Sequence, residues 1–234
     1  MQNEINAAKR VVIKVGSSLL IRDGTLDIQW LAGLAEEIKT ASARGQQIMV
    51  VTSGAVALGS ANAGLDRQTL TLEQSQAAAA IGQIALTQGW QDCLADKGLK
   101  AAQILLTLDD TEQRRRYLNA RRTLQALLDM GTVPIINEND TVATQELRYG
   151  DNDRLAARVA GMMSADCLIL LSDVEGFYTA APETDKNADL ICEVTDVSDD
   201  LLAMAGGAGS AVGSGGMVTK LQAAQIAMQA GCHM

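Results

Sequence analysis

The sequence predicts an α/β protein, an open αβα sandwich with a mostly parallel central sheet. Apolar, β-rich runs alternate with helical patterns along the chain, which is typical of a parallel sheet covered by helices on both faces. Several of these runs end directly in polar loops, and ligands bind beyond the carboxyl ends of such strands. The chain has 234 residues, 47% of them hydrophobic, so it can bury a large core, and we expect one domain over residues 1–234.

Each expected element depends on a local pattern. Apolar runs of strand length predict strands at 10–15, 47–52, 101–107, 132–136 and 166–171, with a shorter one at 190–194. Helical patterns predict helices at 28–43, 71–94, 109–130, 154–163 and 217–230. Asp27 is the expected N-cap of the first helix and Gly45 is its stop signal. The segment Thr71-Leu72-Glu73-Gln74 matches a capping box for the second.

Composition excludes several classes of function. The formal net charge of -9 and the pI near 4.6 argue against a nucleic-acid binder, so the arginines at 114–116 and 121–122 are interpreted as a solvated helix face. No apolar run approaches the roughly 18 residues of a membrane span, and the N-terminus lacks a signal-peptide pattern. We therefore expect a cytoplasmic protein with no membrane partner. The four cysteines are widely spaced, which indicates free thiols rather than a zinc site or disulfides.

The most informative stretch is the polar loop at 137–153, between a predicted strand and a predicted helix. It contains five acidic residues and three asparagines. A loop of this kind at the carboxyl end of a strand is interpreted as a binding site. The alternative is a solvated loop in which Asn and Asp serve only as turn formers.

Two other strand ends carry candidate binding residues. Lys14 lies inside an apolar strand, where a buried ammonium must be paired or face a cleft; alternatively, it is an edge-strand lysine whose head stays in water. Gly54 permits close backbone approach, and Ser53 either donates to a ligand carboxylate or only caps the next helix. A nucleophilic Ser53 is disfavoured, because the motif is not Gly-x-Ser-x-Gly and the one histidine, His233, lies at the far end of the chain.

A glycine tract at 206–216 leads directly into the helix that carries Lys220 in its first turn. Consecutive glycines let backbone N–H groups converge on an anion, and a helix N-terminus adds partial positive charge. The tract matches neither a Walker A loop nor Gly-x-Gly-x-x-Gly after a strand. Phosphate binding is the favoured interpretation, and a flexible loop is the alternative.

Five motifs together resemble the glutamate 5-kinase family of the amino-acid kinase superfamily. They are Lys14-Val15-Gly16-Ser17-Ser18, Val51-Thr52-Ser53-Gly54-Ala55, Asn137-Glu138-Asn139-Asp140, Gly150-Asp151-Asn152-Asp153 and Gly215-Gly216-Met217-Val218-Thr219-Lys220. The resemblance runs from about Lys9 to the last residue. It implies ATP-dependent phosphorylation of the γ-carboxylate of L-glutamate, the first step of proline synthesis. It also implies Mg²⁺ held mainly by the nucleotide phosphates, feedback inhibition by proline, and a homo-oligomer, either a dimer or a tetramer.

The resemblance also assigns roles to residues. Lys14 and Lys220 match catalytic lysines that contact the phosphate, and Asp153 matches the aspartate that holds them in place. The implied substrate contacts are Ser53, Gly54, Asn137, Asp140, Asp151 and Asn152. The implied nucleotide contacts are Lys14, Gly16, Ser172, Asp173, Ser214, Gly215, Gly216, Met217, Val218, Thr219 and Lys220. No metal ligand from the protein is implied.

The chain departs from the family pattern in three places. Ser172 replaces the usual threonine but keeps the hydroxyl, whereas Ala181 and Glu183 replace an aspartate and an arginine near the nucleotide. The chain also stops where another strand is due and lacks the small RNA-modification-type PUA domain common in the family, so we expect a piece of a longer chain. The alternatives are another kinase of the same fold, for acetylglutamate or aspartate, and a catalytically silent amino-acid sensor.

Overall fold

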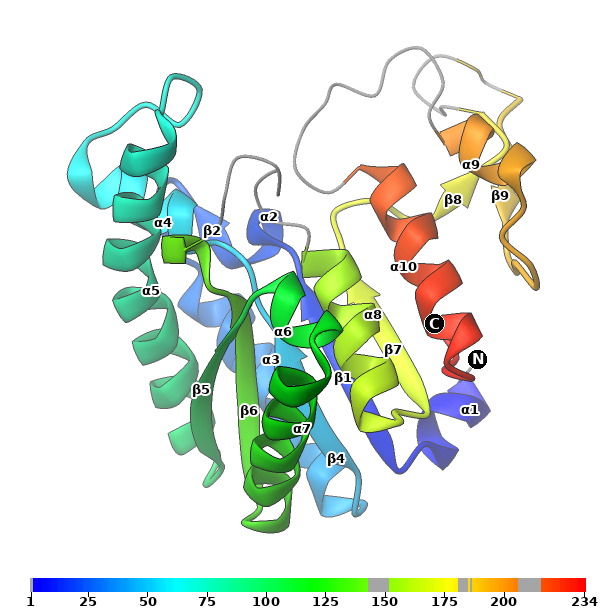
Figure 1. Cartoon of the computed structure of the whole chain (residues 1–234), viewed down its shortest axis with the longest axis horizontal. Coiled ribbons are helices and arrows are strands. Elements are labelled where there is room, and N and C mark those ends of the chain that lie inside the picture. The colour runs from blue at the N-terminus through cyan, green and yellow to red at the C-terminus, as the bar shows by residue number, and fades with distance from the viewer. Residues whose placement is uncertain (1, 143–151, 181–184, 186, 206–215) are drawn as a thin grey trace.

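The computed structural model describes residues 2–142, 152–180, 185, 187–205 and 216–234. Its centre is a five-stranded sheet in the order β5-β6-β4-β1-β7 (Figure 1). Every neighbouring pair in this sheet is parallel. The strands are β1 (Arg10–Val15), β4 (Gln47–Val51), β5 (Lys100–Leu106), β6 (Thr132–Glu138) and β7 (Cys167–Leu171). The predicted fold class is therefore confirmed, and the five main strands lie within one or two residues of their expected positions.

Helices cover both faces of the sheet (Figure 1). One face packs against α3 (Ile28–Ala43), α4 (Ala55–Ala63) and α5 (Leu72–Ala95). The other face packs against α7 (Arg114–Asp129), α8 (Asn152–Met163) and α10 (Met217–Gln229). The smaller elements are α1 (Gln2–Ala7), α2 (Ser17–Leu20), α6 (Leu108–Glu112), η1 (Asp140–Val142), α9 (Asp199–Ala205) and two antiparallel pairs, β2 (Ile21–Arg22) with β3 (Thr25–Leu26) and β8 (Phe177–Tyr178) with β9 (Leu190–Ile191).

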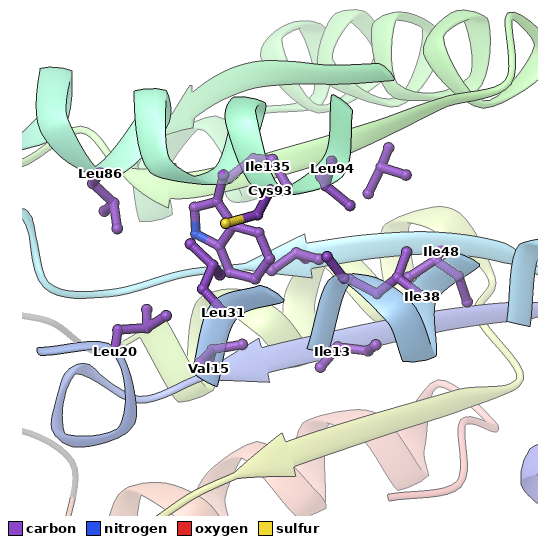
Figure 2. Packing of buried hydrophobic residues seen from close by; sticks show 14 of the residues in the cluster. Ile13, Val15, Leu20, Leu31, Ile38, Ile48, Leu86, Cys93, Leu94 and Ile135 are labelled. Carbon is purple, nitrogen blue, oxygen red and sulfur yellow. The ribbon is translucent and has the colours of Figure 1, made fainter. Parts of the chain in front are cut away.

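Alternation along β1 divides the core in two. Val11, Ile13 and Val15 belong to the core beneath α3 and α5, where Figure 2 shows Val15 near Leu31 of α3. Val12 belongs to the opposite core, beneath α8 and α10. Because side chains two residues apart share a face, Lys14 is on the α8 and α10 side. The strand itself thus directs this lysine toward the helices that carry the other charged candidates.

The caps explain where the helices begin. Asp27 accepts a hydrogen bond from the Trp30 amide at the start of α3, and Thr71 and Gln74 form the predicted capping box of α5. The single helix predicted at 109–130 is wrong, because the chain forms two helices, α6 and α7, there. Gln113 has extended backbone (φ −75°, ψ 114°) and ends one helix while preceding the other. Helix α6 also begins with a capping box of its own, at Thr107 and Asp110.

Helices α4 and α5 cross with their backbones in contact. A Cβ added at Gly59 would lie 1.7 Å from the Ala78 carbonyl oxygen, and one added at Gly82 would lie 1.9 Å from the Ala55 carbonyl oxygen. Only glycine fits at such distances, so these two positions fix α5 against the helix that follows Ser53 and Gly54.

The residues after α10 return to the amino end of β7. The Leu168 amide donates to the His233 carbonyl oxygen at 2.7 Å, and the His233 amide donates to the Asp166 carbonyl oxygen at 3.0 Å. His233 is therefore at the opposite end of the sheet from Lys14, which lies near the carboxyl end of β1. No helix within the described ranges is long and apolar enough to cross a membrane.

Candidate active site

Lys14 is buried near the carboxyl end of a central strand. Strand β1 pairs with β4 on one side and β7 on the other, so the alternative of an edge-strand lysine is wrong. The Lys14 side chain is 9% exposed, and its Nζ lies 2.6 Å from Oδ1 of Asp153. The ammonium is thus paired inside the protein, as a lysine in so apolar a strand requires.

Asp153 of α8 contacts three side chains, one from strand β1 and two from helix α10. It is in the first turn of α8 and is almost fully buried. Besides Lys14, it has Lys220 Nζ 3.6 Å from Oδ2 and the Thr219 hydroxyl 3.1 Å from the same oxygen. Two ammonium groups thus lie beside one buried carboxylate, an arrangement that suits an anionic ligand such as a phosphate.

Lys220 and Thr219 come from the first turn of α10. Gly216 is the N-cap residue, and its carbonyl oxygen lies 2.7 Å from the Thr219 hydroxyl. Met217 and Val218 are half-buried in the same turn. Ser214 and Gly215, which complete the predicted nucleotide loop, lie outside the described residues.

Ser172 and Asp173 follow β7 at the same edge of the sheet. The Ser172 hydroxyl donates to Oδ1 of Asp173 at 3.2 Å. Burial alone would raise the pKa of the Asp173 carboxyl, but hydrogen bonds from its own backbone, Ser172 and Ser18, together with the charge of Lys220, hold that pKa below its usual value. Asp173 is therefore an anion in reach of the Lys220 charge. Gly16 lies between these groups, since a Cβ added to it would be 3.9 Å from Lys14 Nζ and 3.7 Å from the Ser18 hydroxyl.

A second cluster is formed by side-chain amides. Asn152 Nδ2 donates to the Ser53 hydroxyl at 3.0 Å and lies 3.3 Å from Asn137 Oδ1. Ser53 therefore does not act as the cap of α4, whose N-cap is Gly54 with no side-chain cap bond. Asn152 adjoins Asp153 in the sequence, so the amide cluster and the charged cluster share the start of α8. Because the two clusters are adjacent, they suit two ligands that bind next to each other, one at each cluster.

Gly54 has a conformation that favours glycine. Its φ is 111°, and a Cβ placed there would lie 2.7 Å from Cδ1 of Ile21. The turn carries the chain from β4 into α4 and holds Ser53 at the edge of the sheet. Gly54 thus shapes the site through its backbone.

Asp140 lies where β6 ends, at the start of η1. Burial raises the pKa of its carboxyl to about 6, well above the ordinary value. Such a carboxyl is stabilised in its charged form by a cation, and an amino-acid ammonium would supply one. Asp151, the remaining predicted substrate contact, lies outside the described residues.

Two residues of the site were missed by the sequence analysis. Gln83 of α5 accepts a hydrogen bond from Asn137 Nδ2 at 2.7 Å, and Ser18 contributes to the environment of Asp173. Gln83 is one of several glutamines in α5, so the sequence offered no signal that distinguished it. Ser18 is in the first turn of α2, which begins just after β1 ends, and residues at strand ends often contribute to binding sites. No group of three or more His, Cys, Asp or Glu side chains within the described ranges is arranged to hold a metal ion.

These features define an α/β protein with two lysines paired to a buried aspartate, and a neighbouring cluster of side-chain amides, at the carboxyl edge of a parallel sheet. The chain belongs to the amino acid kinase family, whose sequence model matches residues 9–234. It is 59% identical over 230 residues to a glutamate 5-kinase from Paramagnetospirillum magneticum (strain ATCC 700264 / AMB-1), covering 97% of this chain and 62% of the relative. It is also 57% identical over 228 residues to a glutamate 5-kinase from Rhodopseudomonas palustris (strain BisB5), covering 97% of this chain and 61% of that relative. The chain thus spans about three fifths of the length of these curated relatives.

A solved structure supports the fold. The UMP kinase from Bacillus anthracis superposes with a TM-score of 0.59 at 16% sequence identity. The match covers 93% of this chain and 83% of that one. At so low an identity the likeness concerns the fold alone.

Proposed function

We propose that this chain transfers the γ-phosphoryl group of ATP to the γ-carboxylate of L-glutamate, giving L-glutamyl 5-phosphate for proline synthesis. The observation that carries the proposal is the approach of Lys14 and Lys220 to opposite oxygens of the buried Asp153 carboxylate. The names of the curated relatives add the substrate. In this arrangement the charged cluster binds the transferred phosphoryl group and the amide cluster binds the amino acid.

The proposed reaction needs no general base. The glutamate side chain has an ordinary pKa of about 4.3, so its carboxylate is already an anion at neutral pH. One carboxylate oxygen forms a bond to the γ-phosphorus while the bond from that phosphorus to the bridging oxygen breaks, and ADP leaves with the electron pair. The remoteness of His233 from this edge of the sheet is consistent with a reaction in which no proton moves.

The protein's main task is then to bring two anions together. Lys14 and Lys220 offset charge on the phosphoryl group, and Asp153 holds both ammonium groups in position. Orientation of the two reactants contributes as well, because a bound pair avoids the entropy of a bimolecular encounter. Both effects depend on the first turns of α8 and α10, where these side chains are held.

Mg²⁺ fits this site as a partner of the nucleotide. Asp153 already contacts two lysines, so its carboxylate is not available as a metal ligand. The nucleotide phosphates themselves would therefore hold the ion. When bound, Mg²⁺ neutralises phosphate charge.

The amino-acid end of the site is assigned to Ser53, Asn152 and Asp140, with Asp140 facing the substrate ammonium. Proline also has an ammonium and an α-carboxylate, and we propose that it inhibits by competing for this region. For the homo-oligomer, the apolar surface formed by Ile81 and Ile84 of α5, 42% and 75% exposed, is the proposed contact with a second copy.

The test is a coupled assay of ADP release with ATP, Mg²⁺ and a panel of acceptors. We expect ADP release with L-glutamate and little with N-acetyl-L-glutamate or L-aspartate, and we expect proline to reduce the rate. Release with one of the other acceptors but not with L-glutamate would assign a different kinase. Calorimetric binding of L-glutamate without any ADP release would instead indicate an amino-acid sensor.

A further inference from the structure

Gln83 begins a line of amide hydrogen bonds that reaches the amino-acid end of the site. Its Nε2 donates to the Thr87 hydroxyl at 3.1 Å, one turn along α5. Its Oε1 accepts from Asn137 Nδ2 at 2.7 Å. Gln83 therefore presents its acceptor to β6 while its donor is occupied on its own helix.

This polarity continues through Asn137 into α8. Because Asn137 Nδ2 is directed to Gln83, Oδ1 of Asn137 is the atom that remains for Asn152. Asn152 Nδ2 lies 3.3 Å from that oxygen and 3.0 Å from the Ser53 hydroxyl. Because Nδ2 of Asn152 donates to Ser53 and Asn137, the carbonyl oxygen of Asn152 faces away from both residues.

Oδ1 of Asn152 is the last atom in this series of hydrogen-bonded side chains. Asn152 is only 3% exposed, and its Oδ1 has no hydrogen-bond partner among the residues that the structure describes. A buried acceptor left unpaired is unfavourable, whereas a ligand donor can satisfy it. Since Asn152 adjoins Asp153, the donor would be on a ligand that extends from the charged cluster.

Close helix packing keeps the start of the line in place. Gly82 precedes Gln83, and its Cα lies against the backbone of α4, where a Cβ would be 1.9 Å from the Ala55 carbonyl oxygen. The position of Gln83 is thus set by a helix contact that tolerates no larger residue. A single hydrogen bond then transmits that position to Asn137.

We propose that Gln83 is a positioning residue for the amino-acid substrate, acting through Asn137 to hold the Asn152 carbonyl toward the substrate ammonium. The inference deepens the proposed function and depends on it for the identity of the ligand. It requires no contact between Gln83 and the substrate. Gln83 therefore affects affinity for the amino acid and leaves the phosphoryl end unchanged.

The test compares Gln83→Met with Gln83→Glu. Methionine has a similar length but no acceptor for Asn137, so we expect KM for L-glutamate to rise about tenfold with kcat and KM for ATP within a factor of two. Glutamate keeps an acceptor for Asn137, and the Thr87 hydroxyl can rotate to donate to it. Gln83→Glu should therefore restore most of the affinity. Gln88→Met is the matched control, because Gln88 is on the same helix and donates only to the exposed Asp92 within the described residues.

The inference is overturned if Gln83→Met leaves KM for L-glutamate within twofold of the parent, or raises KM for ATP by the same factor. It is also overturned if Gln88→Met gives the same change. Calorimetric titration of L-glutamate into the parent and the three variants separates this inference from the proposed function. A parent that binds L-glutamate but releases no ADP contradicts only the kinase, and the affinities of the variants then still decide the role of Gln83. A parent that binds no L-glutamate contradicts both.

Discussion

Lys14 Nζ lies 2.6 Å from Oδ1 of Asp153, with both side chains almost completely buried. Removing one member of a buried ion pair leaves an uncompensated charge, which costs more than the pair itself contributes. Lys220 approaches the second oxygen of the same carboxylate, so the charges of both lysines are held in place by Asp153. Two ammonium groups side by side suit an anionic ligand.

Replacing Asp153 by Asn tests this charge balance. The amide keeps the shape but leaves the buried Lys14 ammonium unpaired, so we expect the free energy of unfolding to fall by about 3 kcal/mol and kcat to fall by about a hundredfold or more. Chemical denaturation and the ADP-release assay measure the two effects. Glu37→Gln, at an exposed position of α3, is the control and should change neither. A fully stable and active Asp153→Asn would show that the lysines need no such anchor.

Lys220→Ala separates binding of the amino acid from chemistry. We expect kcat to fall by about a hundredfold or more, as for loss of a transition-state contact, while affinity for L-glutamate is largely kept. Steady-state kinetics and calorimetry with L-glutamate check the two parts. Lys100→Ala, at an exposed position of β5, should behave as the parent. Activity of Lys220→Ala within a factor of two of the parent would remove Lys220 from the reaction.

The raised pKa of Asp140 predicts a pH-dependent affinity. Burial raises the pKa of this carboxyl to about 6, so below that pH it is mostly neutral and cannot pair with an ammonium. We expect the dissociation constant for L-glutamate to rise as the pH falls from 8 to about 5.5, with an inflection near 6. Asp140→Asn should bind more weakly and lose that inflection. The same inflection in both proteins would assign the titration to another group.

The raised pKa of Asp140 also affects stability. As the pH rises, the affinity for L-glutamate should increase, whereas the contribution of Asp140 to the free energy of unfolding should decrease. Between about pH 4, the ordinary value, and about 6 the folded protein holds a proton on Asp140 that the unfolded chain has lost. The contribution of Asp140 to the free energy of unfolding therefore decreases as the pH rises through this window. Chemical denaturation of the parent and Asp140→Asn at pH 4.5 and 7 measures this effect. The free energy of unfolding of Asp140→Asn, relative to that of the parent, should be higher at pH 7 than at pH 4.5. An equal difference at both pH values would mean that the pKa of Asp140 is not raised.

Gly82→Ala tests the helix contact that positions Gln83. The new methyl group would meet backbone atoms of α4, so we expect destabilisation by about 1–3 kcal/mol or more and weaker binding of L-glutamate. Gly33→Ala is the matched control, since Gly33 is inside α3 with no atom within 4 Å of an added Cβ. That substitution should raise stability by about 0.5–1 kcal/mol through helix propensity. Equal effects at the two positions would argue against close packing at Gly82.

Much of the fold was predictable because local signals agreed with the tertiary structure. The strand ending at Lys14, the Asp27 cap and the Thr71 capping box are each encoded within a few residues. The convergence of Lys14 with Asp153 also had a local basis, because both residues are at the expected carboxyl edge of the sheet. That Lys14 and Lys220 contact the same aspartate was anticipated only through the family resemblance.

The errors and omissions came from tertiary context. The break at Gln113 depends on an extended residue between two helices that have continuous helical character in the sequence. Gln83 contacts Asn137 because Gly59 and Gly82 let α5 approach α4 closely. No sequence pattern near Gln83 predicts that contact. The choice between a cap and a ligand contact for Ser53 likewise depended on Asn152, which is distant in the sequence.

The most direct test of the central claim identifies the phosphorylated group. An acyl phosphate reacts with hydroxylamine, so the reaction with ATP, Mg²⁺ and L-glutamate can be run in its presence and the product identified by mass spectrometry. We predict the γ-hydroxamate of glutamate, formed only with ATP and reduced about a hundredfold or more in Lys220→Ala. Absence of the γ-hydroxamate, or its undiminished formation by Lys220→Ala, would contradict the account.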